Sequence, residues 1–156
     1  MIADDTDPAA QACVRLVYRA ALYTDHGRWE ELADLFVQDG RLVRPSDPSP
    51  IVGRANILTS LRARPARTTR HLLGNVLVEM HSATRARIDS TVTLFSGPAP
   101  TADAAATGGP GVGAALPVPG QAIMVGNFED EVALTAQGWR FLVRGGSMAL
   151  KFERAP

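Results

Sequence analysis

The hydrophobic pattern of the chain changes near residue 66, and this change limits the possible folds more than any other feature. Before it, apolar residues recur mostly every three or four positions, which is the pattern of amphipathic helices. After it, they alternate with polar residues or form long β-branched runs, which is typical of strands. A chain that groups its helices before its strands, instead of alternating them, is predicted to form an α+β domain.

Three helices are predicted in the first part of the chain. Asp7 caps the first helix, Pro8 lies in its first turn and Gly27 ends it. Its apolar stripe consists of Ala10, Val14, Val17, Tyr18, Ala21 and Leu22. The apolar stripe of the second helix consists of Trp29, Leu32, Ala33, Leu35 and Phe36. A short strand at 41–44 then ends at the proline-rich segment PSDPSP, and the third helix is predicted at 53–61.

Four long strands are predicted at 68–80, 84–95, 121–134 and 139–152. The segment at 97–120 is rich in glycine, proline and alanine and lacks periodicity. We therefore expect a flexible loop there, either a simple insertion between two strands or a lid. Because neither layer can hide its apolar side alone, the three helices are expected to pack on one face of a curved antiparallel sheet. A single domain over 1–156 is enough for this arrangement.

The composition limits the classes of partner. The chain has 156 residues and a formal net charge of zero, whereas domains that bind nucleic acid or anionic membranes usually carry a basic excess. Neither partner is expected. Cys13 is the single cysteine, which excludes an intramolecular disulfide. No stretch of about 18 apolar residues and no secretory signal occur, so the expected location is the cytoplasm.

Asp25 is the first candidate for a functional residue, because it continues the apolar stripe of the first helix. At about 100° per residue it points within roughly 20° of Val14 and Tyr18. An unpaired buried carboxylate is costly, so Asp25 either ends the helix at the surface or faces a polar cavity where it has a partner. His71, near the start of the 68–80 strand, is the natural partner.

A carboxylate that is hydrogen-bonded to one imidazole nitrogen fixes the tautomer and raises the basicity of the other nitrogen. Such a pair is suited to proton abstraction near neutral pH. A structural role for His71 on its strand is the alternative. Leu73 and Asn75 are predicted to share the strand face of His71.

Arg144 is a charged residue among the apolar residues of the last strand, on the same face as Met148. It could hold an anion, a carbonyl oxygen or a leaving group, or it could form a salt bridge with an acidic residue at 129–131. Tyr18 and Tyr23 could donate hydrogen bonds into a pocket. The candidate catalytic residues are His71, Asp25, Arg144 and Tyr18. The candidate substrate-binding residues are Tyr23, Leu73, Asn75, Met148 and Phe36.

The sequence motifs of nucleotide-binding, flavin-dependent and zinc-dependent enzymes are absent. His71 and His81 are ten residues apart on one strand, about 33 Å if it is extended, so they cannot share a metal ion. We therefore expect neither a cofactor nor a metal.

The order of these segments resembles the SnoaL-like branch of the NTF2-like superfamily. The resemblance runs from about Ala10 to Phe152 and is carried by YTDHGRWEELADLFVQDG, the helix after VGR, TRHLLGNVLVE and GWRFLVRGGSMAL. It implies a cone of helices wrapped by a curved antiparallel sheet around a mainly apolar pocket. The dehydratases and dehydrochlorinases of this superfamily use an aspartate–histidine pair as the base, which implies these roles for Asp25 and His71. Arg144 matches the arginine before the glycine in the last strand of the dehydrochlorinase.

The resemblance implies a cofactor-independent lyase or isomerase that acts on a small, largely apolar, cyclic molecule. In this hypothesis His71 is the base, Asp25 orients it, and Arg144 and Tyr18 polarise an oxygen or a leaving group. A homo-oligomer, dimer or trimer, is expected. Two alternatives stay open: a polyketide-type cyclase with Asp25 as its main acid–base group, and a non-catalytic small subunit of a ring-hydroxylating oxygenase. A module that only binds a ligand is a further hypothesis.

Overall fold

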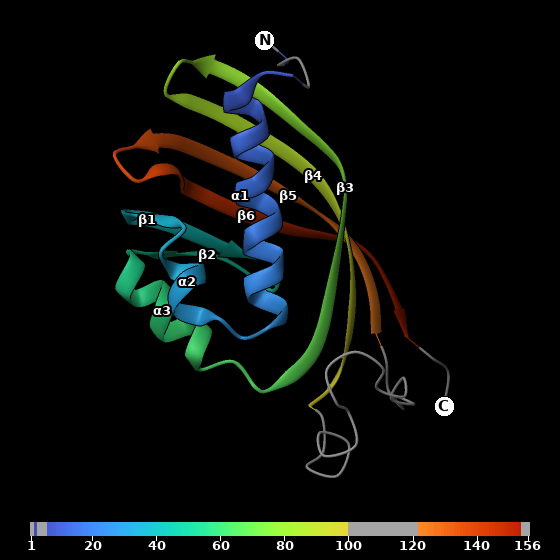
Figure 1. Ribbon diagram of the computed structural model, residues 1–156. Coiled ribbons are helices and arrows are strands. Elements are labelled where there is room, and N and C mark those ends of the chain that lie inside the picture. Colours follow the sequence, from blue (N-terminus) through green and yellow to red (C-terminus); the bar gives the residue numbers. More distant parts are fainter. Residues whose placement is uncertain (1, 3–5, 100–121, 154–156) are drawn as a thin grey trace, which may run out of the picture.

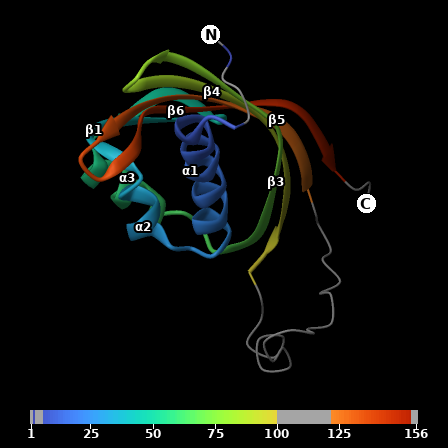
Figure 2. The same ribbon diagram turned by 45° about the horizontal axis from the view of Figure 1, so that its top comes forward.

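The computed structural model describes residues 2, 6–99 and 122–153, which form three helices and six strands. The helices are α1 (Pro8–Asp25), α2 (Trp29–Ala33) and α3 (Arg54–Arg62). The strands are β1 (Phe36–Arg44), β2 (Asp47–Val52), β3 (Arg67–Ser82), β4 (Arg85–Pro98), β5 (Ala122–Thr135) and β6 (Gly138–Glu153). They form one sheet in the order β2–β1–β6–β5–β4–β3, which curves around α1 (Figure 1, Figure 2).

The predicted α+β class and the curved sheet are confirmed, but the sheet is mixed and not antiparallel throughout. β1 runs parallel to β6, with Phe36 opposite Phe141 and Leu42 opposite Arg144. The other neighbouring strands are antiparallel. Residue periodicity indicates that a segment is a strand, but the direction of a strand depends on how distant segments pair, which periodicity does not contain.

The second predicted helix is shorter than its apolar stripe indicates. α2 has five residues, and the chain is already in β1 at Phe36. The run Leu35-Phe36-Val37 suits a strand as well as a helix, and it pairs with β6 through the Phe141 amide, which donates to the Leu35 carbonyl at 2.8 Å. The segment PSDPSP was predicted to end a strand, yet its last residues belong to β2, because prolines are tolerated in an edge strand.

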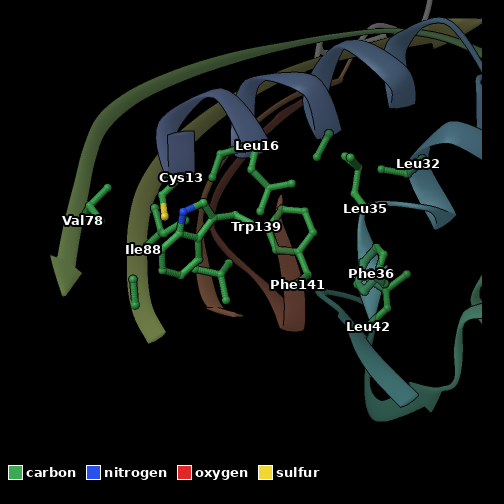
Figure 3. Close-up of a cluster of buried hydrophobic side chains, with 14 of the residues drawn as sticks. Cys13, Leu16, Leu32, Leu35, Phe36, Leu42, Val78, Ile88, Trp139 and Phe141 are labelled. Atoms are coloured by element: carbon green, nitrogen blue, oxygen red, sulfur yellow. The ribbon is translucent and has the colours of Figure 1, made fainter. Parts of the chain in front are cut away.

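The core lies between α1 and the concave face of the sheet. Leu16 and Cys13 of α1 pack toward Trp139 and Phe141 of β6 (Figure 3), and the ring centroids of Phe36 and Phe141 are 5.2 Å apart. Burial of one such large apolar side chain stabilises a fold by about 1.5–3 kcal/mol. The buried residues of α1 are Ala10, Cys13, Leu16, Val17, Ala20 and Ala21.

A bulge in β3 changes which residues face the core. The pairing of β3 with β4 shifts between Gly74 and Leu77, and Asn75 between them has a φ of +50°. One extra residue reverses the alternation of side chains. His71 and Leu73 therefore point inward before the bulge and Val78 after it, whereas Asn75 is exposed.

The predicted loop at 97–120 lies outside the described residues except at its beginning, where Gly97 and Pro98 extend β4. Among the helices of the described part, none has the length and apolar character that a membrane span needs.

The close approach of β5 and β6 makes Gly126 a sensitive position. A Cβ atom at Gly126 would overlap the Ser147 backbone carbonyl, whereas a Cβ at the exposed Gly74 would meet nothing within 4 Å. We predict that Gly126→Ala lowers the free energy of unfolding by about 1–3 kcal/mol, the usual cost of overpacking. The matched control Gly74→Ala should leave it unchanged or slightly raised. Thermal unfolding followed by circular dichroism measures both, and equal melting temperatures would contradict the predicted clash.

Candidate active site

Asp25 is the last residue of α1, and its carboxylate is hydrogen-bonded to residues of β3, the strand that runs alongside that helix (Figure 1). Oδ2 accepts a hydrogen bond from the backbone N–H of His71 at 2.8 Å. Oδ1 accepts from the Thr69 hydroxyl at 2.9 Å and lies 2.5 Å from His71 Nδ1. The helix can end here because Gly27 takes a φ of +64°, which glycine adopts without strain.

The structure thus brings Asp25 and His71 together, and both side chains are largely shielded from solvent. The exposed fraction is 8% for the Asp25 side chain and 11% for that of His71. His71 Nδ1 faces the carboxylate, which places the proton of the neutral imidazole on Nδ1 and leaves Nε2 as the acceptor. Within the described part of the chain, Nε2 has no hydrogen-bond partner.

Asp25 and His71 line a cavity of about 780 Å³, a size that takes a drug-sized ligand. Most of its wall is apolar and comes from the helices and from the concave face of the sheet. The apolar lining includes Leu32, Phe36, Leu42, Leu94, Met124 and Phe128. A buried acid–base pair that opens into a largely apolar cavity is an arrangement that suits proton transfer to and from carbon.

The Asp25 carboxyl stays ionised in this site. Its burial raises the pKa, but the hydrogen bonds from the backbone amide and the imidazole of His71 and from Thr69 outweigh burial. The pKa of Asp25 therefore lies below its usual value.

The pKa of His71 is also lowered, which differs from the increase that its carboxylate partner was predicted to cause. Burial is the largest effect and lowers the pKa of His71. The hydrogen bond and the charge of Asp25 raise it, whereas the charges of Arg144 and Arg64 lower it further. The net result is an imidazole that is neutral at neutral pH but still oriented by a carboxylate.

Arg144 lines the same cavity and is held by a buried ion pair. Its Nη1 donates to Asp130 Oδ2 at 2.9 Å, and its guanidinium carbon lies 4.0 Å from the ring centroid of Phe128 and 4.9 Å from that of Phe141. Burial raises the pKa of Asp130 to about 7, against the lowering effect of Arg144. The sequence left a salt bridge and an anion-binding role open as alternatives for Arg144. The two are compatible, since Arg144 pairs with Asp130 and also lines the cavity.

Tyr18 and Tyr23 do not line the cavity, which corrects their predicted placement. Tyr18 is 49% exposed. The buried face of α1 includes Cys13, Leu16 and Ala20, which the predicted stripe left out, whereas Leu22 of that stripe is half-exposed like Tyr18. Tyr23 packs against the core, and the guanidinium carbon of Arg28 lies 4.5 Å from the centroid of the Tyr23 ring.

Of the other predicted substrate-binding residues, two line the cavity and two do not. Phe36 and Met148 line the cavity. Leu73 does not, although it faces inward and packs against the core. Asn75 is on the opposite face, because the β3 bulge reverses the alternation between it and His71.

Sequence reasoning missed several cavity residues. Thr69, whose hydroxyl donates a hydrogen bond to Asp25, was not among the predicted site residues. Arg44, Arg64 and Trp29 also line the cavity. No local pattern marks the two arginines, and Trp29 was predicted only as part of an apolar helix stripe, because the three segments meet only in the folded chain. Among the described residues, no group of three or more histidine, cysteine, aspartate or glutamate side chains could hold a metal ion.

Comparison with known proteins places this geometry in context. A family model described as a SnoaL-like domain matches residues 8–145, and no curated protein matches the sequence. A Novosphingobium aromaticivorans protein that is provisionally named a scytalone dehydratase has a similar structure. It is 21% identical over 94% of this chain and 87% of its own, with a TM-score of 0.72.

Two further solved structures are similar. Hexachlorocyclohexane dehydrochlorinase type 2 is 14% identical over 94% of this chain and 90% of its own, with a TM-score of 0.73. A protein from Novosphingobium aromaticivorans that is provisionally named an aromatic ring hydroxylase is 17% identical over 94% of this chain and 93% of its own, with a TM-score of 0.72. At these identities the structural likeness shows a common fold alone.

The contact between Asp25 and His71 predicts how His71 titrates. Because the hydrogen bond and the charge of Asp25 raise the pKa of His71, Asp25→Asn should lower this pKa further. Asp89→Asn makes the same chemical change at an exposed carboxylate that pairs with Arg87, and it should have no effect. NMR titration of the His71 ring measures the three pKa values. An Asp25 variant that titrates like the unchanged protein would show that the contact is not made in solution.

Proposed function

Because the chain belongs to the SnoaL-like domain family of the NTF2-like superfamily, we propose that it is a cofactor-independent lyase or isomerase with the Asp25–His71 pair as its general base. One observation carries this proposal: the 2.5 Å contact between Asp25 Oδ1 and His71 Nδ1 lies on the wall of a largely apolar cavity, with Nε2 unoccupied by any described residue.

In the proposed reaction, Nε2 of neutral His71 takes a proton from a carbon of the substrate. The C–H bond breaks, the N–H bond forms, and Asp25 stabilises the resulting imidazolium through Nδ1–H. In an elimination the electron pair forms a C=C bond and expels a leaving group, such as hydroxide, which His71 protonates, or chloride. In an isomerisation the pair moves onto an adjacent carbonyl oxygen, and His71 returns the proton to another carbon.

Arg144 is the group we propose to stabilise negative charge on the oxygen or leaving group. Its guanidinium lines the cavity and keeps a fixed position through Asp130 and the Phe128 ring. A fixed cationic group in a partly dry site acts strongly on charge that develops during the reaction. Tyr18, which the sequence offered for the same task, is left out because its side chain is half-exposed and outside the cavity.

The proposed substrate is a small, largely apolar, cyclic molecule. The apolar wall supports this, and so do the names of two structural relatives, a protein provisionally named a scytalone dehydratase and a hexachlorocyclohexane dehydrochlorinase. For a polyketide-type cyclase, the lowered pKa of Asp25 is unfavourable, because an ionised carboxylate cannot act as the acid. A non-catalytic small subunit of an oxygenase would need neither a ligand-sized cavity nor an oriented base in its wall.

The homo-oligomer and the cytoplasmic location expected from the sequence stay predictions. For the homo-oligomer, we propose the outer face of the sheet as the contact surface. Exposed apolar side chains lie there on β3, β4 and β6, among them Leu72, Phe95, Leu150 and Phe152.

The proposal predicts that His71→Ala lowers turnover by about 10²–10⁴-fold, the usual contribution of a general base. His81→Ala removes an exposed histidine beside Glu79 and should leave turnover unchanged. A panel of cyclic ketones and of hydroxylated or chlorinated cyclohexanes is incubated in deuterium oxide. Mass spectrometry then detects deuterium uptake, loss of water or loss of chloride. Equal rates for the His71 variant and the unchanged protein would contradict the mechanism, provided that circular dichroism shows both folded.

The pH dependence follows from the direction of the His71 pKa. His71 accepts a proton only when it is neutral, so kcat/KM should fall as the pH drops through its pKa in the free enzyme. Because burial and the two arginines hold that pKa below the ordinary value of 6.5, we predict that the midpoint of the acid limb lies below pH 6.5. An acid limb centred above pH 6.5 would mean that the base is another group, or that His71 is more solvated than the structure has it.

A further inference from the structure

We propose that the substrate of this cavity carries a carboxylate, which binds Arg64 and Arg44 while the apolar part of the molecule reaches His71. The inference rests on the proposed function for its setting, since it names the substrate class of the same cavity. It goes beyond that function, because neither the general base nor Arg144 requires a charged substrate.

The charges that line the cavity are unbalanced. Four guanidinium groups contribute to the wall: Arg44, Arg64, Arg67 and Arg144. Among the described residues that line it, Asp25 is the one carboxylate, and its oxygens already accept hydrogen bonds from Thr69 and His71. Since Asp130 neutralises Arg144, the remaining positive charge lies with the other three arginines.

Arg64 and Arg44 have no ion-pair partner among the described residues. Arg67 has none either, but it is exposed, whereas Arg64 and Arg44 are half-buried. Three nearby arginines, Arg28, Arg54 and Arg62, pair with Glu31, Asp34 and Glu30. The charge of Arg44 does act on Asp47, but that carboxyl is exposed and its pKa is lowered first by hydrogen bonds from Ser49. Asp47 does not line the cavity.

Arg64 is also partly removed from water. It follows α3, and its guanidinium carbon lies 6.0 Å from the ring centroid of Trp29, another cavity residue. Burial lowers the pKa of Arg64, and the charge of Arg44 lowers it further. Two like charges that share a partly dry wall repel each other, and a bound anion would relieve both the repulsion and the desolvation.

The shape of the site favours a carboxylate on an apolar molecule. A guanidinium presents a planar fork of donors that matches the two oxygens of a carboxylate. Beyond the arginines, the wall is formed by apolar side chains such as Leu61, Leu94 and Phe128. A small inorganic anion would leave this wall uncovered, whereas an apolar ring with a carboxylate satisfies both parts.

Binding of a carboxylate has a consequence for His71. The charge of Arg64 lowers the pKa of His71, so an anion on Arg64 should cancel this effect and raise the pKa in the complex. The general base would then hold a proton more firmly when the substrate is present than when the cavity is empty.

Isothermal titration calorimetry with 2-naphthoate and its neutral isostere 2-naphthamide tests the proposal. The unchanged protein should bind naphthoate at least tenfold more tightly than the amide. Arg64→Gln and Arg44→Gln should each remove most of this preference and leave amide binding unchanged, and Arg64→Lys should keep part of it. Arg62→Gln is the matched control, because Arg62 pairs with Glu30 outside the cavity, and it should keep the full preference.

NMR titration of His71 supplies a second measurement. Naphthoate should raise the pKa of His71 and the amide should not, and the Arg64→Gln variant should lose this response. Equal affinity for the two probes, no binding of either probe, or an equal loss in the Arg62 variant would overturn the proposal. Circular dichroism establishes that each variant is folded.

The outcome is separable from the proposed function, because binding is measured without turnover. If the preference for naphthoate is absent while His71→Ala abolishes deuterium uptake, the anion site fails and the general base stands. If the preference is present and depends on Arg64 while His71→Ala leaves turnover unchanged, the anion site stands and the general base fails.

Discussion

The hydrogen bonds that Asp25 accepts from β3 are the interaction on which the site depends. A carboxylate at the C-terminus of a helix is unfavourable, because the helix dipole places negative charge there, and the last turn of α1 has no basic residue to offset it. Burial adds a further cost. Three donors from Thr69 and His71 compensate for both. They also join the end of α1 to the start of β3, so that one contact closes the cavity wall and orients the base.

The features that sequence predicted well are those that local periodicity contains. The start of α1 at Pro8, its end before Gly27 and the four long strands follow from caps and alternation. The juxtaposition of Asp25 and His71 followed chiefly from the family resemblance, because the face arithmetic referred Asp25 to Tyr18, which is half-exposed. Family membership is confirmed by the match over residues 8–145. Where local geometry is interrupted, prediction fails. The bulge at Asn75 reverses the inward and outward alternation of side chains along β3. The two prolines of β2 are atypical of strands, so this edge strand was not predicted.

The cavity charges could not be predicted from the sequence for a different reason. Arg64 follows α3, Arg44 ends β1, and both are ordinary arginines in a chain that has almost no lysine. Their importance comes from sharing a wall with His71 while having no carboxylate beside them. Likewise, Asp130 was one of three acidic residues that could have reached Arg144, and only the register of β5 against β6 selects it. Long-range pairing decides both cases, and spacing along the chain does not contain it.

The same set of charges explains why an aspartate partner and a lowered histidine pKa occur together. Asp25 alone would favour the imidazolium, which cannot accept a proton. Burial, Arg144 and Arg64 act in the opposite sense and keep His71 neutral. Asp25 then contributes chiefly orientation in the resting site, and its charge becomes important once a proton has arrived on Nε2. Positive groups around the base therefore serve two ends, since they keep it unprotonated and form a wall suited to an anion.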